Sequence, residues 1–329
     1  MPPMPVTAGD VVAALLKTVL YATTFAGAGG VLFVLLCRQQ LLPTEIRRLA
    51  RFFGICFVLA VLVSGLRVMQ LAGELSGDAD GMLDQTYVGL VLQAGERSAV
   101  LQRLVGLVLA AFVFSRRSIL RSVSGLGALL AATSIVWVSH AHASPRPAGP
   151  MLLEAVHLAG IAFWLGALVP LWLIAAQDAR GHRIAAAAMR FGRAAVPAIG
   201  LLLLAGLAWL WQLLGSSQAA WHSDYARLMV LKLVFVAALL GLGALNKFRL
   251  TPRLARGDRG AARQLRRSIQ FEILLAATIL TVTATMTTLT GPPGGAIAGP
   301  TRGGLRTTWT AREPPPPDRA APSARFDRG

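Results

Sequence analysis

The chain has 329 residues, of which 55% are hydrophobic and only 14% are charged, and its mean hydropathy is +0.60. A soluble domain carries charge on about a quarter of its residues, so this composition excludes an ordinary soluble globular protein. The formal net charge of +17 does not indicate nucleic-acid binding, because the basic residues lie in short loops between apolar runs, where membrane topology places them.

Apolar runs of about 18 residues or more recur along the chain, and each is long enough to cross a bilayer. They must be helices, since lipid offers backbone amides no partner outside their own segment. The first run lacks a basic leader and is overlong for a signal peptide, so we expect it to be retained. Small residues four apart in it (Ala22, Ala26, Gly30) predict a closely packed neighbouring helix. We predict an all-α polytopic bundle of eight transmembrane helices, over residues 11–37, 51–72, 99–115, 119–140, 151–176, 192–214, 226–246 and 268–290.

These spans form one predicted transmembrane domain, residues 1–290. The Pro/Arg-rich segment that follows, residues 291–329, has the composition of a disordered tail. The only two cysteines do not imply a disulfide framework.

Lysine and arginine are distributed unequally among the connections. Nineteen of them lie in or beside the connections that precede the second, fourth, sixth and eighth spans, whereas the intervening loops hold only Arg97 and Arg146. Cytoplasmic connections carry such an excess of basic residues. The pattern therefore predicts that these four connections are cytoplasmic and that both termini lie outside.

The predicted topology places the side chains that can bind metal on two different sides of the membrane. His157 lies about two turns below the outer surface, and Cys37 and Cys56 lie near the inner ends of their spans. Imidazole, thioether and thiolate are the ligands that Cu(I) favours, and cytoplasmic thiols stay reduced. The pattern predicts a copper route from outer donors to inner thiols, although any single methionine, taken alone, is better explained as a filler of apolar gaps than as a ligand. The outer donors, besides His157, are His140, His142, Met151, Met229 and Met286.

Ionisable residues within the outer half of the spans are the second signal. Glu154 and His157 are three residues apart and share one helix face, and ionisable groups at such depth face the bundle interior or a water-filled cavity. His157 is interpreted either as a metal ligand or as a hydrogen-bonded helix contact. Lys232 lies at a similar depth and either extends outward to the surface or pairs with Glu154.

Other charged residues are placed by depth alone. Glu272 lies near the inner end of its span, where Arg266 or Arg267 is the expected partner. Arg67 and Arg103 lie near outer span ends, and we expect their side chains to extend to the membrane surface.

Several stretches carry a combined pattern that is specific to one family. They are SHAHA around His140, HLAGIAFWLGALVPL from His157, YARLMVLKLVFVAALLGLGALNKFRLTPRL with Tyr225, Lys232 and Asn246, and LRRSIQFEILLAATIL with Arg267, Ser268 and Glu272. Together they resemble the copper resistance protein D (CopD) family of bacterial inner-membrane proteins over about residues 130–292. The sequence departs from the family at Ala226, where glycine is common, and in its doubled histidine, so either His140 or His142 corresponds to the family position.

The resemblance implies an eight-helix protein of the bacterial inner membrane that confers copper tolerance and moves copper inward. Copper ions are the expected cargo, with Cu(I) favoured over Cu(II), and a periplasmic copper-binding protein is the implied partner. Glu154, Lys232, Tyr225 and Glu272 are the residues expected to line or support the path.

Two alternatives stay open at this point. One is a b-type haem electron-transfer protein, in which His140 and His157 ligate one iron from facing helices; the inner side offers no histidines for a second haem. The other is an assembly subunit without an ion path. The sequence contains no hydrolase triad, phosphate loop or dinucleotide fingerprint, so we do not expect an enzyme.

Overall fold

The computed structural model describes residues 6–139, 141–142, 146–178, 181–214 and 224–290, and all regular structure in these ranges is helical. The predicted tail, residues 291–329, and His140 lie outside the described residues. The α-helices are α1 (Ala8–Cys37), α2 (Pro43–Ser76), α3 (Gln85–Val91), α4 (Arg97–Ala110), α5 (Ser118–Thr133), α6 (Ala148–Gln177), α7 (His182–Leu214), α9 (Asp224–Leu245), α10 (Thr251–Ala255) and α11 (Arg259–Leu289).

The predicted all-α membrane bundle is confirmed. Within the described ranges, eight helical segments are long and apolar enough to cross a membrane. Several begin well before the apolar run that predicted them: the second begins at Pro43 and the third at Gln85. A helix can continue beyond the hydrocarbon layer because its backbone bonds are internal, so hydropathy marks the membrane crossing and not the helix end.

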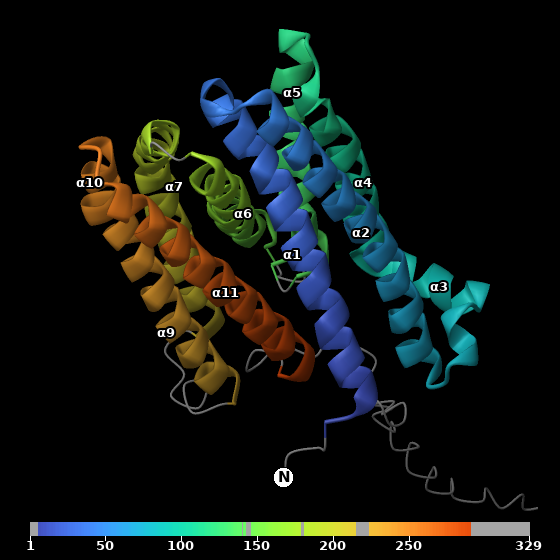
Figure 1. Cartoon of the computed structure of the whole chain (residues 1–329). Helices are drawn as coiled ribbons and strands as arrows, with labels where there is room; N and C mark the ends of the chain where they lie inside the picture. Colours follow the sequence, from blue (N-terminus) through green and yellow to red (C-terminus); the bar gives the residue numbers. More distant parts are fainter. Residues whose placement is uncertain (1–5, 140, 143–145, 179–180, 215–223, 291–329) are drawn as a thin grey trace, which may run out of the picture.

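The helix α1 occupies the middle of the bundle (Figure 1), where it contacts α2, α5, α6 and α11. On one side of α1 lie α2 to α5, and on the other lie α6, α7, α9 and α11. The helix α9 is peripheral and packs mainly on α11. Its outward side chains, such as Val230 and Val234, are more than half exposed, as expected of residues that face lipid.

The ends of the helices agree with the charge pattern. The end of α1, the starts of α5 and α7, and the helix α10 all lie at the same end of the bundle (Figure 1). The four basic connections therefore gather there. In the following sections this end is called the basic end, and the topology predicts that it faces the cytoplasm.

Glycines on α1 allow the central helices to approach each other closely. A Cβ at Gly29 would lie 1.7 Å from the Ala162 carbonyl oxygen on α6, and one at Gly166 would lie 2.1 Å from the Gly29 carbonyl carbon. A Cβ at Gly30 would lie 2.3 Å from the Phe53 ring on α2. The predicted close packing of the first span thus occurs on two faces of α1. Gly29 lies on the face towards α6, and Gly30 lies on the face towards α2.

An ion pair ties α2 to α7 at the basic end. Both carboxylate oxygens of Glu45 lie 2.9 Å from Nη1 of Arg183, and the backbone amide of Leu42 donates to Oε2 at 2.8 Å. The Glu45 side chain is fully buried, whereas that of Arg183 is 28% exposed. A buried carboxylate that keeps its charge needs such a partner.

Replacing Arg183 with alanine is expected to lower the free energy of unfolding by roughly 2 kcal/mol. Removing one partner of a fully buried pair costs about 3–5 kcal/mol, and the partial exposure of Arg183 reduces that penalty. Denaturant titration of the purified protein in detergent measures the change. The control is Arg227→Ala, which removes the exposed pair with Asp224 and should have no measurable effect. Equal effects of the two substitutions would contradict a structural role for the Glu45 pair.

Candidate functional site

The His157 imidazole lies between α6 and α7. Its Nδ1 is 3.0 Å from the Leu202 carbonyl oxygen of α7. A carbonyl oxygen only accepts hydrogen bonds, so Nδ1 must carry the proton and Nε2 keeps its lone pair. Histidines that bind metals are oriented in this way, with one ring nitrogen donating to a backbone carbonyl and the other left for the ion.

The room for this ring is supplied by Gly206, one helical turn beyond Leu202. A Cβ at position 206 would lie 2.8 Å from Cε1 and 3.0 Å from Nδ1 of His157. Any larger residue would therefore displace the imidazole. The ring orientation depends on both the Leu202 carbonyl and the missing side chain at Gly206.

Glu154 lies one turn from His157 on the same face of α6. Its carboxylate accepts a hydrogen bond from the Ser139 hydroxyl, at the end of the fourth span. Lys232 of α9 lies close enough to this carboxylate for their charges to interact. Among the described residues no ion pair within 4.0 Å joins Glu154 to Lys232, so the predicted pairing acts at longer range, and Ser139 is the direct partner.

Two of the predicted thioether donors, Met229 and Met286, belong to one cluster of packed side chains. Met286 of α11 and Tyr225 of α9 are both buried, with exposed fractions of 2% and 5%, and Met229 packs against them together with Leu210 of α7. Leu210 lies one turn beyond Gly206 on α7, and Gly206 faces the His157 ring. Where this cluster meets α7, it therefore lies about one helical turn along α7 from the level of that ring. The structure thus brings Met229, Met286 and Tyr225 into one cluster.

The remaining outer donors lie elsewhere. Met151 is half-buried at the start of α6 and packs against the core. His142 is exposed and lies edge-on to Trp137, with ring centroids 5.4 Å apart. Its partner in the doubled motif, His140, lies outside the described residues.

The two cysteines are not brought together. Cys37 is fully buried at the end of α1, where its Sγ lies 3.8 Å from the Ala187 carbonyl oxygen of α7. Cys56 is 5% exposed on α2 and lies level with Gly27. Gly27 is ten residues before Cys37 on α1, a distance of about 15 Å along the helix. Within the described ranges no three side chains of His, Cys, Asp or Glu lie close enough together to hold one metal ion.

A second polar cluster lies towards the basic end, and it corrects the expected partner of Glu272. The buried Glu272 carboxylate accepts a hydrogen bond of 2.5 Å from Nδ2 of Asn246, and not from an arginine. The Arg266 guanidinium instead lies over the Trp172 ring, 5.5 Å from its centroid. The Asn246 Oδ1 and the Ser268 hydroxyl are buried without a hydrogen-bond partner. These oxygen atoms suit a proton or a hard cation better than Cu(I).

Arg103 corrects a further expectation, because its side chain is buried and does not extend to the surface. It is 3% exposed and donates from Nε to Ser134 at 3.1 Å and from Nη1 to Ser64 at 2.7 Å. Arg67, in contrast, is half-buried and donates to Gln70 at 3.1 Å. The hydroxyls of neighbouring helices thus replace the water that the membrane surface would supply.

Lys17 is a buried charge that the sequence analysis did not single out. Its ammonium group donates to the Thr287 carbonyl oxygen at 3.0 Å and to the Thr287 hydroxyl at 3.2 Å, which links α1 to α11. The signal was present in the sequence, because a lysine inside an apolar span is costly and marks a position that faces the bundle interior.

The fold and the site together define a polytopic helix-bundle membrane protein that holds an oriented imidazole between α6 and α7 and a separate cluster with two thioethers. Comparison with protein families assigns both halves of the chain. The model of the copper resistance protein D-like N-terminal domain matches residues 8–149, and the model of copper resistance protein D matches residues 185–286. The chain belongs to the copper resistance protein D family and is a copper-resistance membrane protein.

The family match confirms the resemblance and extends it to the first four spans, where the sequence motifs are weaker. Glu154 and His157 lie in the segment between the two matched ranges. Searches of curated proteins and of solved structures give no match.

Proposed function

We propose that this protein carries copper ions across the bacterial inner membrane, from the periplasm towards the cytoplasm, and that this transport contributes to copper resistance. The observation that supports the proposal is the His157 ring, whose Nδ1 donates to Leu202 and whose Nε2 is left with a lone pair. Membership in the copper resistance protein D family supports copper as the metal.

The donor set favours Cu(I) over Cu(II) as the cargo. The thioethers of Met229 and Met286 lie in one cluster with Tyr225, at a level of α7 about one turn from that of the imidazole. Soft sulfur ligands select the monovalent ion. A cation in a low-dielectric bundle also needs nearby negative charge. The carboxylate of Glu154, one turn from His157, provides it, while Lys232 limits the net charge of the site.

The predicted path begins at the outer ends of α6 and α9. The exposed His142 and the half-buried Met151 lie where a periplasmic copper-binding protein would deliver the ion. Cys37 and Cys56 stay a prediction for the inner end, although the structure separates them. The proposed activity is transport without a catalysed reaction.

His157→Ala is expected to abolish the gain in cell-associated copper that expression of the protein produces at limiting copper. Loss of the oriented imidazole should weaken copper binding by at least about tenfold, the lower end of what altered ligand support costs at metal sites. Inductively coupled plasma mass spectrometry of washed cells measures the copper content, normalised to the amount of protein in the membrane.

The matched control is His182→Ala, which removes an exposed histidine at the start of α7 and should leave copper content unchanged. An unchanged copper content in the His157 variant would remove this residue from the path. The optical spectrum of the purified protein separates the haem alternative, because a Soret band in place of bound copper would favour electron transfer.

A further inference from the structure

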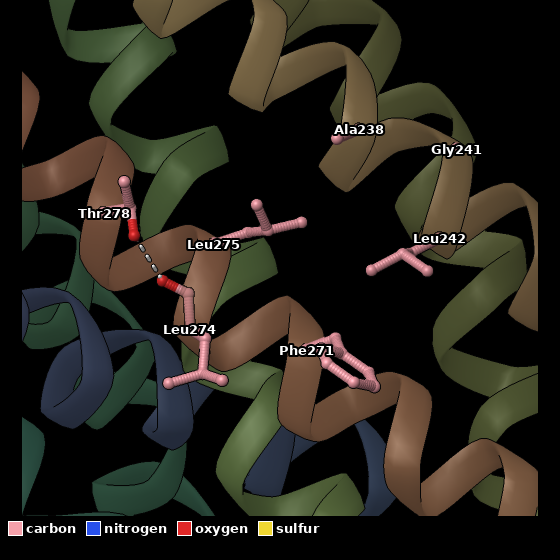
Figure 2. A pocket seen from close by; sticks show the side chains of 7 residues that line it. All are labelled: Ala238, Gly241, Leu242, Phe271, Leu274, Leu275 and Thr278. Atoms are coloured by element: carbon pink, nitrogen blue, oxygen red, sulfur yellow. Dashed lines mark hydrogen bonds between the residues drawn. The ribbon is translucent and has the colours of Figure 1, made fainter.

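The lipid-facing surface between α9 and α11 is hollowed into a groove. Its membrane-embedded part has a volume of about 510 Å³ and is lined by Ala238, Gly241 and Leu242 of α9 and by Phe271, Leu274 and Leu275 of α11 (Figure 2). The hydroxyl of Thr278, which also borders it, donates to the Leu274 carbonyl oxygen at 3.0 Å. This part of the groove is therefore apolar.

A second hollow of about 590 Å³ continues the first towards the basic end. The two share Leu242 and Phe271, and the second adds the side chains of Arg249, Arg253 and Arg267. One groove thus changes along its length from purely apolar to arginine-lined. We call the two parts together the α9–α11 groove.

Two of the three arginines carry uncompensated charge. Arg253 pairs with Asp258, with an Nη2 to Oδ2 distance of 2.7 Å. Arg249 and Arg267 are exposed, and within the described part of the chain neither has a carboxylate partner within 4.0 Å. The arginine-lined part therefore offers two guanidinium groups to an anion.

The length of the groove matches one leaflet of a bilayer. Ala238 precedes Arg249 by eleven residues, which corresponds to about 16 Å along the helix. Half of the hydrocarbon core is about 15 Å thick. When the arginines lie at the headgroup level of the inner leaflet, the apolar part reaches the bilayer centre, the depth to which an acyl chain extends.

We propose that the α9–α11 groove binds one anionic phospholipid of the cytoplasmic leaflet, with an acyl chain between Gly241 and Phe271 and the headgroup phosphate on Arg249 and Arg267. Basic pockets between membrane helices on the cytoplasmic side bind anionic headgroups in this way. Because α9 packs mainly on α11, the lipid bridges the two helices and holds the peripheral one in place.

The test uses the full-length protein in detergent, with phosphatidylglycerol and phosphatidylcholine as probes. We expect phosphatidylglycerol, but not phosphatidylcholine, to raise the thermal unfolding temperature and to stay bound in native mass spectrometry. The double variant Arg249→Gln/Arg267→Gln should bind phosphatidylglycerol at least about tenfold more weakly, since each basic residue near a headgroup contributes to affinity. The matched control, Arg47→Gln/Arg48→Gln, removes two exposed arginines of α2 and should bind as the parent does.

Gly241→Phe tests the apolar part independently. A Cβ at Gly241 has no heavy atom within 4 Å, so the aromatic ring should fill the groove without disturbing the bundle and should also weaken lipid binding. Equal binding of the two lipids, parental affinity in the arginine variant, or displacement of the lipid by inorganic phosphate would overturn the proposal. None of these measurements involves copper, so their outcome is separate from that of the transport experiments.

Discussion

Gly29→Ala should leave little or no folded protein in the membrane fraction. The added Cβ would lie 1.7 Å from the Ala162 carbonyl oxygen, and the obstacle is the backbone of α6, which cannot rotate away as a side chain can. Overpacking of a well-packed core typically costs about 1–3 kcal/mol, and forcing two backbones apart should exceed that range. The yield of monodisperse protein after detergent extraction, followed by thermal unfolding of any recovered protein, measures the effect.

The matched control for this experiment is Gly54→Ala on α2. A Cβ at Gly54 meets no heavy atom within 4 Å, so the change removes only the helix penalty of glycine and should stabilise the protein by up to about 1 kcal/mol. The two substitutions are chemically identical and should differ in sign. If both variants were recovered equally well, the contact between α1 and α6 would be looser than the structure shows.

The eight crossings could be predicted from sequence because they follow from one physical requirement. A segment that spans lipid needs enough apolar residues to match its thickness, and that length is readable residue by residue. The helix ends could not be read in the same way. The α2 segment before Arg51 includes Thr44, Glu45, Arg47 and Arg48 and is nevertheless helical. Its backbone hydrogen bonds are internal, so the helix does not have to end at the edge of the hydrocarbon layer.

Partners of charged residues were harder to predict because hydropathy gives depth but not the direction in which a side chain points around its helix. Glu272 was expected to pair with Arg266 or Arg267, yet its direct partner is Asn246, the residue that follows α9. Arg103 was expected to extend to the membrane surface, but Ser64 and Ser134 accept its hydrogen bonds inside the bundle. Distant helices supply these contacts, and a single sequence does not show which helices are neighbours.

In the candidate site, too, the sequence predicts the depth of a residue but not which side chains it contacts. Met229, Met286 and Tyr225 were placed near the outer end by depth, and the structure brings them together because α9 packs on α11. Cys37 and Cys56 were placed at the inner end by the same reasoning. Cys37 ends α1, whereas Cys56 of α2 lies beside Gly27, ten residues earlier on α1. The role of Gly206 had no signal in the sequence, since a glycine in an apolar helix is ordinary until the ring of His157 is found against it.

Gly206→Ala is expected to impair copper binding while His157 itself stays in the chain. The new Cβ would lie 2.8 Å from Cε1 of His157, and the imidazole can yield because it is the end of a side chain, so the protein should still fold. Moving the ring breaks the Nδ1 hydrogen bond to Leu202, and the loss of such orienting contacts typically costs about 10–100-fold in metal affinity. Competition with a chromophoric Cu(I) chelator measures the affinity of the purified variant.

The control on the same helix is Gly200→Ala, where an added Cβ meets no heavy atom within 4 Å. It should keep parental affinity and at least parental stability, since alanine favours the helix. A Gly206 variant that folds and binds Cu(I) as the parent does would show that the orientation of His157 is irrelevant to copper. Weak binding in both the Gly206→Ala and His157→Ala variants, with no further loss when they are combined, would identify one shared cause, because substitutions that remove the same interaction are not additive.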